Sequence, residues 1–261
     1  MKTFNDRDYA DIMWEEMTWP EIRRKARQGY LAALPLGSIE QHGPMIPVGC
    51  DYFLARSWTL EGARRAKAKY GVKVIVLPAI PYGVSTEHID FAGTVTLNLQ
   101  TYIALLQDII DEVIRSGFRK LACVSGHGGN MVPAQAALRD MKLKLRNRGI
   151  KGFDLYLADS GNCFYDANKL DLKQQYHFHA SACETSYYLF QRPDLVRTKA
   201  LKRPKLKRQS MPLGSWWTKD LTANGASGDP QRATADFGQR IYDGYSEAIA
   251  GFLKKVSSGR P

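Results

Sequence analysis

The chain has 261 residues, of which 44% are hydrophobic and 24% are charged, and its formal net charge is +11. This composition is that of an ordinary globular protein, which excludes a disordered, collagen-like or disulfide-stapled chain. No apolar run approaches the roughly 18 residues that a membrane-spanning helix needs, and residues 1–8 contain no apolar signal core. We therefore expect a cytoplasmic protein with no membrane partner.

The excess positive charge is concentrated in two runs, at residues 142–148 and 197–208. We interpret both runs as solvated surface, although an anionic substrate, a subunit contact or incidental polyanion binding would also suit them. The sequence contains no zinc finger, no aromatic RNA-binding signature and no basic zipper. We therefore expect no nucleic-acid partner.

Apolar runs alternate with amphipathic stretches along the chain. The runs predict buried strands at residues 31–36, 72–77, 120–125 and 153–157. The amphipathic stretches predict helices at residues 51–69, 99–116, 181–191 and 234–255. Asn130 is expected to cap a further helix, with Pro133 in its first turn.

Strands that alternate with helices favour an α/β fold, with a mostly parallel sheet and helices on both faces. The sequence shows no repeat and no low-complexity linker, so we expect a single domain over residues 1–261. Residues 193–232 form the least regular segment and include the adjacent Trp216 and Trp217. Structureless loops of this length are uncommon without a function. We therefore predict that this segment caps a neighbouring active site or packs at a subunit contact of a homo-oligomer.

A first polar segment directly follows the strand predicted at residues 31–36. Glu40 and His42 are two residues apart, so in an extended backbone they point to the same side, and Asp51 follows at the start of the next helix. Two carboxylates and an imidazole near one strand end suit zinc, manganese or iron. The alternative is a polar turn in which Asp51 caps the helix.

A second polar segment surrounds His127, between a strand and a helix start. The adjacent Gly128 and Gly129 let the backbone pass close to a ligand. A phosphate-cradling loop is the alternative, but the segment lacks the glycine spacing of such loops and is not a nucleophile elbow. We therefore interpret His127 as a metal ligand. We expect Gly128, Gly129, His88 and Tyr176 to contact the substrate.

A third polar segment covers residues 176–186. His179 and Glu184 are five residues apart at a helix start, within reach of one cavity. A histidine beside a polarised carbonyl could act as a general acid or base. We interpret His177 as a surface or packing residue. The four cysteines form no CxxC pair, and we expect Cys123 and Cys183 to be buried small side chains.

Together these segments resemble the creatininase (creatinine amidohydrolase) family. The resemblance runs from about Trp14 to the C-terminal helix, and the combination of motifs is specific although each alone is weak. The residues that carry it, as they stand in this sequence, are Glu40-x-His42, Asp51, Ser-Gly-His127-Gly-Gly-Asn, His179-Ala-x-x-x-Glu184-Thr-Ser, Glu87-His88-x-x-Phe-Ala-Gly93-Thr94 and Ser227-Gly228-Asp229-Pro230.

The resemblance implies a three-layer α/β/α sandwich with a mostly parallel central sheet, a two-metal centre and, usually, a homohexamer. Zinc is the expected metal, with manganese or iron as alternatives. Carried over by position, the ligands of one ion would be Glu40, Asp51 and His127. Those of the other would be His42, the shared Asp51 and Glu184. His179 matches the catalytic histidine of the family.

Two departures from creatininase itself argue against creatinine as the substrate. Creatininase has a carboxylate where this chain has Gly129, and the Trp-Asp pair before its catalytic histidine is missing here, with Gln175-Tyr176 nearby. Relatives in the family act on formamides, peptide precursors and cyclic sugar-derived ketones. The family therefore does not identify the substrate.

The expected chemistry is hydrolysis. Two metals bridged by Asp51 would share a water and lower its pKa from about 15.7 towards about 7. The resulting hydroxide would attack a carbonyl, and His179 would donate a proton to the departing nitrogen. We therefore predict a metal-dependent amidohydrolase that opens a cyclic amide or cleaves a formamide-type C–N bond of a small molecule. The alternatives are a family member acting on a ring ketone of a dehydro-sugar or inosose, or on a peptide precursor, and a non-catalytic binding protein.

Overall fold

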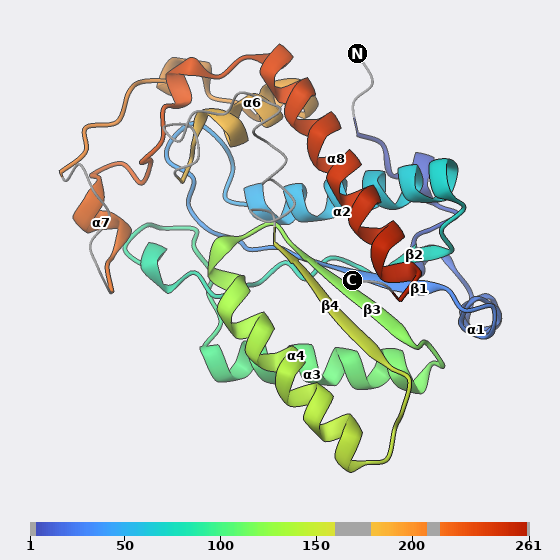
Figure 1. Ribbon diagram of the computed structural model, residues 1–261. Helices are drawn as coiled ribbons and strands as arrows, with labels where there is room; N and C mark the ends of the chain where they lie inside the picture. Colours follow the sequence, from blue (N-terminus) through green and yellow to red (C-terminus); the bar gives the residue numbers. More distant parts are fainter. Residues whose placement is uncertain (1–3, 160–178, 208–214, 260–261) are drawn as a thin grey trace.

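A parallel sheet lies between two layers of helices (Figure 1). The computed structural model describes residues 4–159, 179–207 and 215–259, and there the strand order is β2-β1-β3-β4. The strands are β1 (Leu31–Leu36), β2 (Val74–Val76), β3 (Lys120–Ser125) and β4 (Asp154–Asp159). This arrangement confirms the predicted three-layer α/β/α sandwich.

The strands are apolar because both of their faces are buried. In β1, Leu31 and Ala33 pack against one helical layer, whereas alternate residues such as Leu34 pack against the other. A parallel strand covered on both sides reads as a continuous apolar run, which is why residues 31–36 could be predicted from the sequence.

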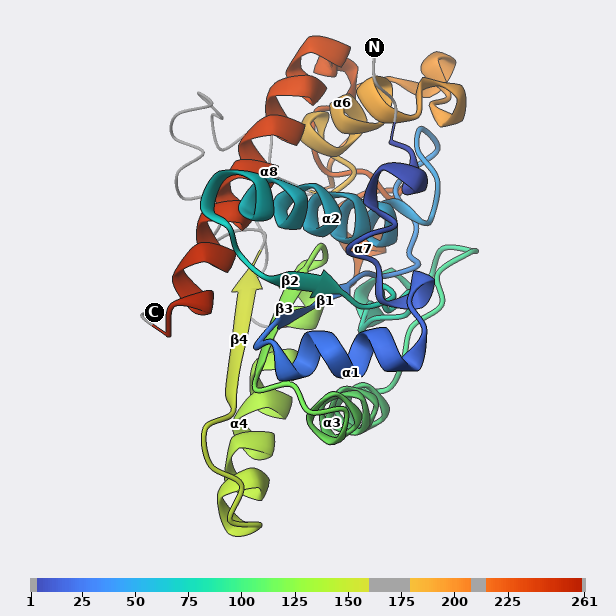
Figure 2. The same ribbon diagram turned by 90° about the vertical axis from the view of Figure 1, so that its right-hand side faces the viewer.

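The helices divide between the two faces of the sheet (Figures 1 and 2). One face is covered by α2 (Cys50–Tyr70), α6 (Ala182–Gln191) and α8 (Ala235–Ser257). The other is covered by α1 (Trp19–Arg27), α3 (Leu99–Arg115) and α4 (Met131–Asn147). The short α7 (Thr218–Leu221) lies apart from both layers, beside the 3-10 turn Thr86–His88. Among the described residues, no helix is long and apolar enough to cross a membrane.

Two strands have bounds that differ from the prediction, and one helix was not predicted. The strand predicted at 72–77 is shorter, because the Val72 N–H bonds to the Ala66 carbonyl oxygen in the turn that closes α2. The strand predicted at 153–157 runs instead from Asp154 to Asp159, residue for residue beside β3. Helix α1 was not predicted, although Thr18 and Glu21 form a capping box at its start and Pro20 lies in its first turn.

Asn130 occupies the N-cap position of α4 and Pro133 lies in the first turn, as predicted, but the Asn130 side chain makes no capping hydrogen bond. Its amide instead accepts a hydrogen bond from the Val84 N–H (3.0 Å) and donates one to the Gly37 carbonyl oxygen (2.9 Å). A fully buried amide must satisfy its donors and acceptors, and here two loops supply the partners. Asn130 therefore joins the loops that follow β1, β2 and β3.

Candidate metal centre

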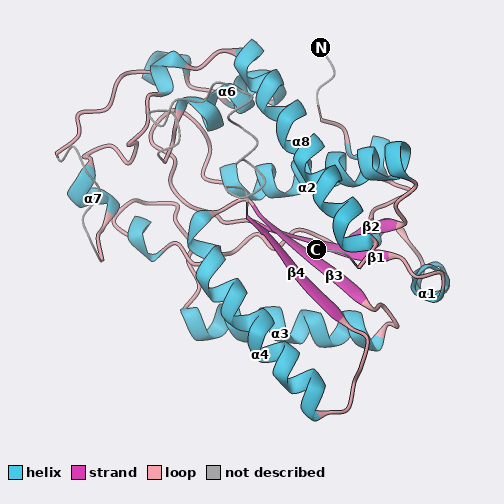
Figure 3. Cartoon of the chain, viewed as in Figure 1, coloured by secondary structure: helices cyan, strands magenta, loops and turns pink. Residues whose placement is uncertain are grey.

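The predicted site residues gather where the parallel strands end. The loops after β1 and β3 leave the sheet on the side of α6 and α7 (Figure 3), which is where ligands bind in open α/β sheets. Asp51 lies in the first turn of α2 and packs against the loop after β3. A Cβ atom on Gly126 of that loop would lie 2.7 Å from the Asp51 carbonyl oxygen, so the approach requires glycine.

Glu40, Asp51 and His127 meet in the interior, as expected. The Nδ1 atom of His127 lies 3.1 Å from Glu40 Oε2 and 3.1 Å from Asp51 Oδ2. All three residues are at least nine-tenths buried, and one ligand atom of each lies within 4.8 Å of the others. The spacing and the donor types are those of a site for a divalent ion.

His42 faces the same carboxylate from the other side. Its Nε2 atom lies 3.3 Å from Asp51 Oδ1 and 3.8 Å from Glu184 Oε1. The second Glu184 oxygen accepts a hydrogen bond from the Ser181 N–H (2.8 Å), which caps α6. One carboxylate therefore stabilises the helix start and presents its other oxygen to His42, although Glu184 belongs to none of the compact ligand groups found in the described residues.

Three buried atoms at this centre make no hydrogen bond within the part of the chain that the structure describes. They are Glu40 Oε2, His42 Nε2 and Asp51 Oδ2. Burial first, and then the neighbouring Asp51 carboxylate, raise the pKa of Glu40 to about 8. Burying polar atoms without hydrogen bonds is costly. A divalent cation that accepts all three lone pairs removes this cost, so the residues fit a metal.

Three histidines are oriented in one way. Each donates one ring N–H to a backbone carbonyl oxygen, so that its other nitrogen faces the buried carboxylates. The three pairs are His42 Nδ1 with Glu40 O (3.2 Å), His127 Nε2 with Val84 O (2.9 Å) and His179 Nε2 with Gln41 O (2.6 Å). A carbonyl oxygen only accepts, so the nitrogen beside it carries a hydrogen in each ring. Burial acts to lower the pKa of His127, but Glu40 and Asp51 outweigh it and raise this pKa to about 10. A metal ion bound there would therefore displace a proton from His127. Metal-binding histidines commonly make this outer hydrogen bond.

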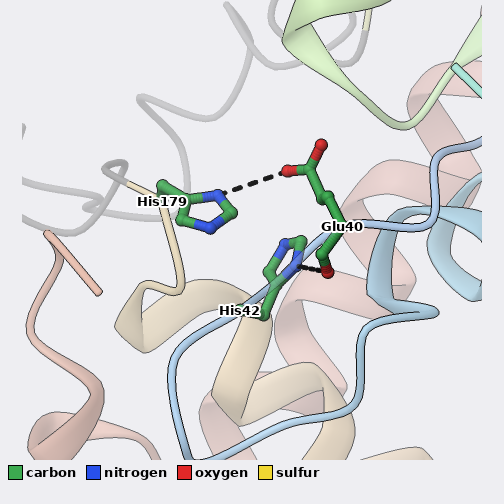
Figure 4. Close-up of side chains that lie close together, drawn as sticks. All are labelled: Glu40, His42 and His179. Atoms are coloured by element: carbon green, nitrogen blue, oxygen red, sulfur yellow. Dashed lines mark hydrogen bonds and ion pairs between the residues drawn. The ribbon is translucent and has the colours of Figure 1, made fainter. Parts of the chain in front are cut away.

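His179 lies directly beside the cluster. Its Nδ1 atom is 3.4 Å from Glu40 Oε1, and its ring centroid lies 4.3 Å from that of His42, with the two rings tilted by 48° (Figure 4). Burial first, and then the neighbouring His42 and His88, hold the pKa of His179 well below its usual value. His179 is therefore neutral at pH 7, with a bare nitrogen facing the centre. With Glu40 and His42 it also forms a candidate ligand group.

His88 lies behind the cluster rather than at its surface. It is only 3% exposed, and its Nε2 atom lies 3.4 Å from Glu40 Oε1. Its Nδ1 atom lies 2.8 Å from Gln41 Nε2 and 2.7 Å from Thr218 Oγ1. Because Gln41 Oε1 accepts from the Gly43 N–H, the Gln41 nitrogen is the donor and His88 Nδ1 accepts. Burial first, and then His42 and His127, lower the pKa of His88 to about 3.

The two glycines after His127 differ. Gly128 is exposed, and a Cβ atom there would meet nothing within 4 Å. A Cβ atom on Gly129 would lie 2.2 Å from the Val84 carbonyl oxygen and 2.4 Å from His127 Nε2. This backbone therefore has no room for a carboxylate at residue 129. Tyr176 and His177 lie outside the described residues.

Sequence reasoning missed Gln41, Thr218 and Cys50. Gln41 stands between Glu40 and His42, where strand alternation would turn it away from the site, yet it contacts His88, His179 and the Gly225 carbonyl oxygen. Thr218 comes from the 193–232 segment of the same chain. The one signal for Thr218 in the sequence is its position next to Trp217, in a segment that we expected to cap a neighbouring active site or to pack at a subunit contact.

The family assignment rests on the whole chain. The family model described as "Creatininase: Creatinine amidohydrolase" matches residues 15–253. The chain belongs to the creatininase family. It is 29% identical to a mycofactocin precursor peptide peptidase of Mycobacterium ulcerans, over 94% of this chain and 87% of that protein. It is 28% identical to a creatinine amidohydrolase of Pseudomonas putida, over 69% of this chain and 72% of that protein.

Solved structures confirm the fold of this creatininase-family chain. A structure described as "Creatininase Mn" superposes with a TM-score of 0.82 at 24% identity, covering 94% of this chain and 98% of that chain. The family assignment makes the chain a hydrolase, and the buried ligand groups form its candidate metal site. The names of these relatives give different substrates, a peptide and creatinine, so family membership does not identify the substrate of this chain.

Proposed function

We propose that this protein is a metal-dependent amidohydrolase that cleaves the C–N bond of a cyclic amide or a formamide-type small molecule. The observation that carries the proposal is the set of three buried atoms without hydrogen bonds in the described residues, on Glu40, His42 and Asp51. Two ions fit the arrangement, because Asp51 presents one oxygen to His127 and the other to His42. Imidazole and carboxylate ligands suit zinc best, with manganese or iron as alternatives.

The chain would hold one ion with Glu40, Asp51 and His127, and the other with His42, Asp51 and Glu184. Divalent ions bound there supply Lewis-acid chemistry, polarising a carbonyl and acidifying water. His179 presents the bare Nδ1 that can take a proton from the attacking water and return it to the leaving nitrogen. An amide nitrogen leaves poorly unless it is protonated, so this transfer is needed for C–N cleavage.

A peptide is the second candidate substrate. It is favoured by the peptidase relative from Mycobacterium ulcerans, which aligns with 94% of this chain. Gly129 supports a substrate other than creatinine, because the backbone there excludes the carboxylate that creatininase carries. A ring ketone of a dehydro-sugar or inosose is a further alternative.

The test combines metal analysis with turnover. The purified protein is assayed for bound metal and for hydrolysis of lactams, hydantoins, formamides, inososes and short peptides, with and without a chelator. We expect about two divalent ions per chain and activity that chelation abolishes and zinc restores. Turnover that survives complete metal removal would contradict the proposal, and product analysis separates the substrate classes.

We also propose a homo-oligomer, a hexamer by family resemblance, in which the 193–232 segment lies at a subunit contact. Trp217 in this segment is 46% exposed in the single chain. Because tryptophan is enriched at protein interfaces, its exposure supports a subunit contact here. Light scattering at micromolar concentration tests this proposal. A strictly monomeric mass would contradict it.

A further inference from the structure

Cys50 is the first residue of α2 and lies directly before Asp51. It is fully buried, and its sulfur lies within 4.8 Å of one ligand atom each of His42 and Asp51. Cys123 and Cys183, the other cysteines that the structure describes, belong to no such group. The sequence prediction did not include Cys50 among the ligands.

The atoms around this sulfur point independently to a cation. His42 uses its Nδ1 hydrogen for the Glu40 carbonyl oxygen, and its buried Nε2 faces Asp51 Oδ1 at 3.3 Å without a well-formed hydrogen bond in the described residues. Asp51 also keeps one buried oxygen without a hydrogen bond in the described residues. An imidazole nitrogen and a carboxylate therefore converge beside the sulfur.

Cys50 also contacts the apolar core beneath α2 and α6. A purely packing role would leave its S–H as a weak donor that any small apolar residue could replace. A coordinating role has a different consequence. Thiolate is a soft ligand that favours zinc and cobalt, whereas manganese prefers oxygen ligands.

We propose that Cys50 is a ligand of the ion held by His42 and Asp51, and that its sulfur biases this position toward zinc over manganese. This inference rests on the metal centre proposed above. On binding, the sulfur–metal bond forms and the thiol proton is released to solvent. The ion at Glu40 and His127 lacks sulfur and keeps an ordinary imidazole–carboxylate preference.

Cobalt titration of the metal-free protein separates the two proposals. Visible d–d bands report that Co²⁺ binds at all, and a near-ultraviolet sulfur-to-cobalt charge-transfer band reports a thiolate ligand. We expect both in the wild type. Cys50→Ser should keep the visible bands and lose the near-ultraviolet band, whereas the matched control Cys123→Ala should keep both.

A competition between Zn²⁺ and Mn²⁺ measures the bias. In Cys50→Ser the ratio of zinc affinity to manganese affinity should fall by at least about 10-fold. Loss of a residue that only hydrogen-bonds to a metal ligand already lowers metal affinity by about 10-fold or more. An unchanged preference would overturn the inference. Zinc-edge X-ray absorption of the wild type needs no variant and should show a sulfur neighbour at about 2.3 Å.

The negative outcomes are distinct. Visible bands without the charge-transfer band, or a charge-transfer band that survives in Cys50→Ser, overturn the role of Cys50 and leave the metal centre intact. An X-ray absorption spectrum with nitrogen and oxygen neighbours alone does the same. Failure to bind cobalt or zinc at all contradicts the metal centre and this inference together.

Discussion

His179 Nε2 lies 2.6 Å from the backbone carbonyl oxygen of Gln41, and this contact turns the other ring nitrogen toward the buried centre. The ring N–H is thereby engaged away from the carboxylates, and the bare Nδ1 lies 3.4 Å from Glu40. The position suits a group that accepts a proton and passes it on. It also lies close enough to the cluster that a ligand role must be tested.

The first prediction therefore compares His179→Ala with Glu184→Gln. His179→Ala should leave metal content and melting temperature nearly unchanged and cut turnover by roughly 10²–10⁴, the usual range for general acid–base catalysis. Glu184→Gln keeps an oxygen that can cap α6 at the Ser181 N–H, but it should weaken metal binding beside His42. Metal analysis, thermal melting and turnover distinguish the two. Loss of a full metal equivalent in His179→Ala would make His179 a ligand.

The second prediction compares two adjacent glycines. Gly129→Ala should lower the free energy of unfolding by about 1–3 kcal/mol, because the new Cβ forces the His127 ring or the Val84 carbonyl to move. It should also weaken metal binding at His127. Gly128→Ala adds a methyl group in open space, so its melting temperature should match the wild type. Equal effects of the two substitutions on stability would contradict the geometry at Gly129.

The third prediction concerns the amide of Gln41. Gln41→Met keeps the length of the side chain but removes the side-chain partner of the Gly225 carbonyl oxygen and of the Gly43 N–H, and one of the two partners of His88 Nδ1. Leaving buried polar groups unpaired should cost about 1–3 kcal/mol, measured by denaturant unfolding. Nitrogen-15 NMR of labelled histidine should show His88 protonated at Nε2 in the wild type.

Thr218→Val is the control for that prediction. It removes one hydroxyl at His88 Nδ1 and leaves the Gln41 donor in place, so the His88 tautomer should persist. A tautomer that changes in Thr218→Val and persists in Gln41→Met would show that Thr218, and not Gln41, orients His88.

The fourth prediction is a pH dependence of stability away from the metal centre. The nearly buried Glu61 carboxylate accepts hydrogen bonds from Arg64 (2.7 Å), Arg65 (2.7 Å) and the Tyr9 hydroxyl (3.1 Å). Burial acts to raise the pKa of Glu61, but the hydrogen bonds from the two arginines outweigh it and lower the pKa. The unfolded chain therefore binds this proton more readily than the folded chain does. The resulting stability is present above the unfolded pKa and is lost as the pH falls through the folded pKa.

Glu61→Gln should consequently cost about 1–3 kcal/mol at neutral pH. Its difference from the wild type should shrink below about pH 4, where the unfolded carboxyl is protonated. Denaturant unfolding at several pH values measures both. The control is Glu112→Gln, which removes an exposed pair with Arg115 and should change stability by less than about 1 kcal/mol. A Glu61→Gln deficit that stays constant with pH would contradict this account.

The layers of the fold could be predicted from the sequence because each depends on short stretches of chain. The β1 run is apolar along its whole length and α3 repeats its apolar residues at helical spacing, and both patterns are local. The boundaries that differed, at Val72 and Asp159, depend on a helix-closing turn and on a neighbouring strand. Neither partner is visible within the segment itself.

The sequence by itself also indicated four residues of the candidate centre, since Glu40, Asp51, His127 and His179 lie at strand and helix ends that a parallel sheet brings to one edge. It did not indicate Gln41, Thr218 or Cys50. Their orientation was decided only by the tertiary structure. Val84 and Gln41 supply the carbonyl oxygens that orient the His127 and His179 rings, and Asn130 joins loops 46 and 93 residues away from it. Hydrogen bonds over such separations depend on how the chain crosses the sheet, which no local spacing encodes.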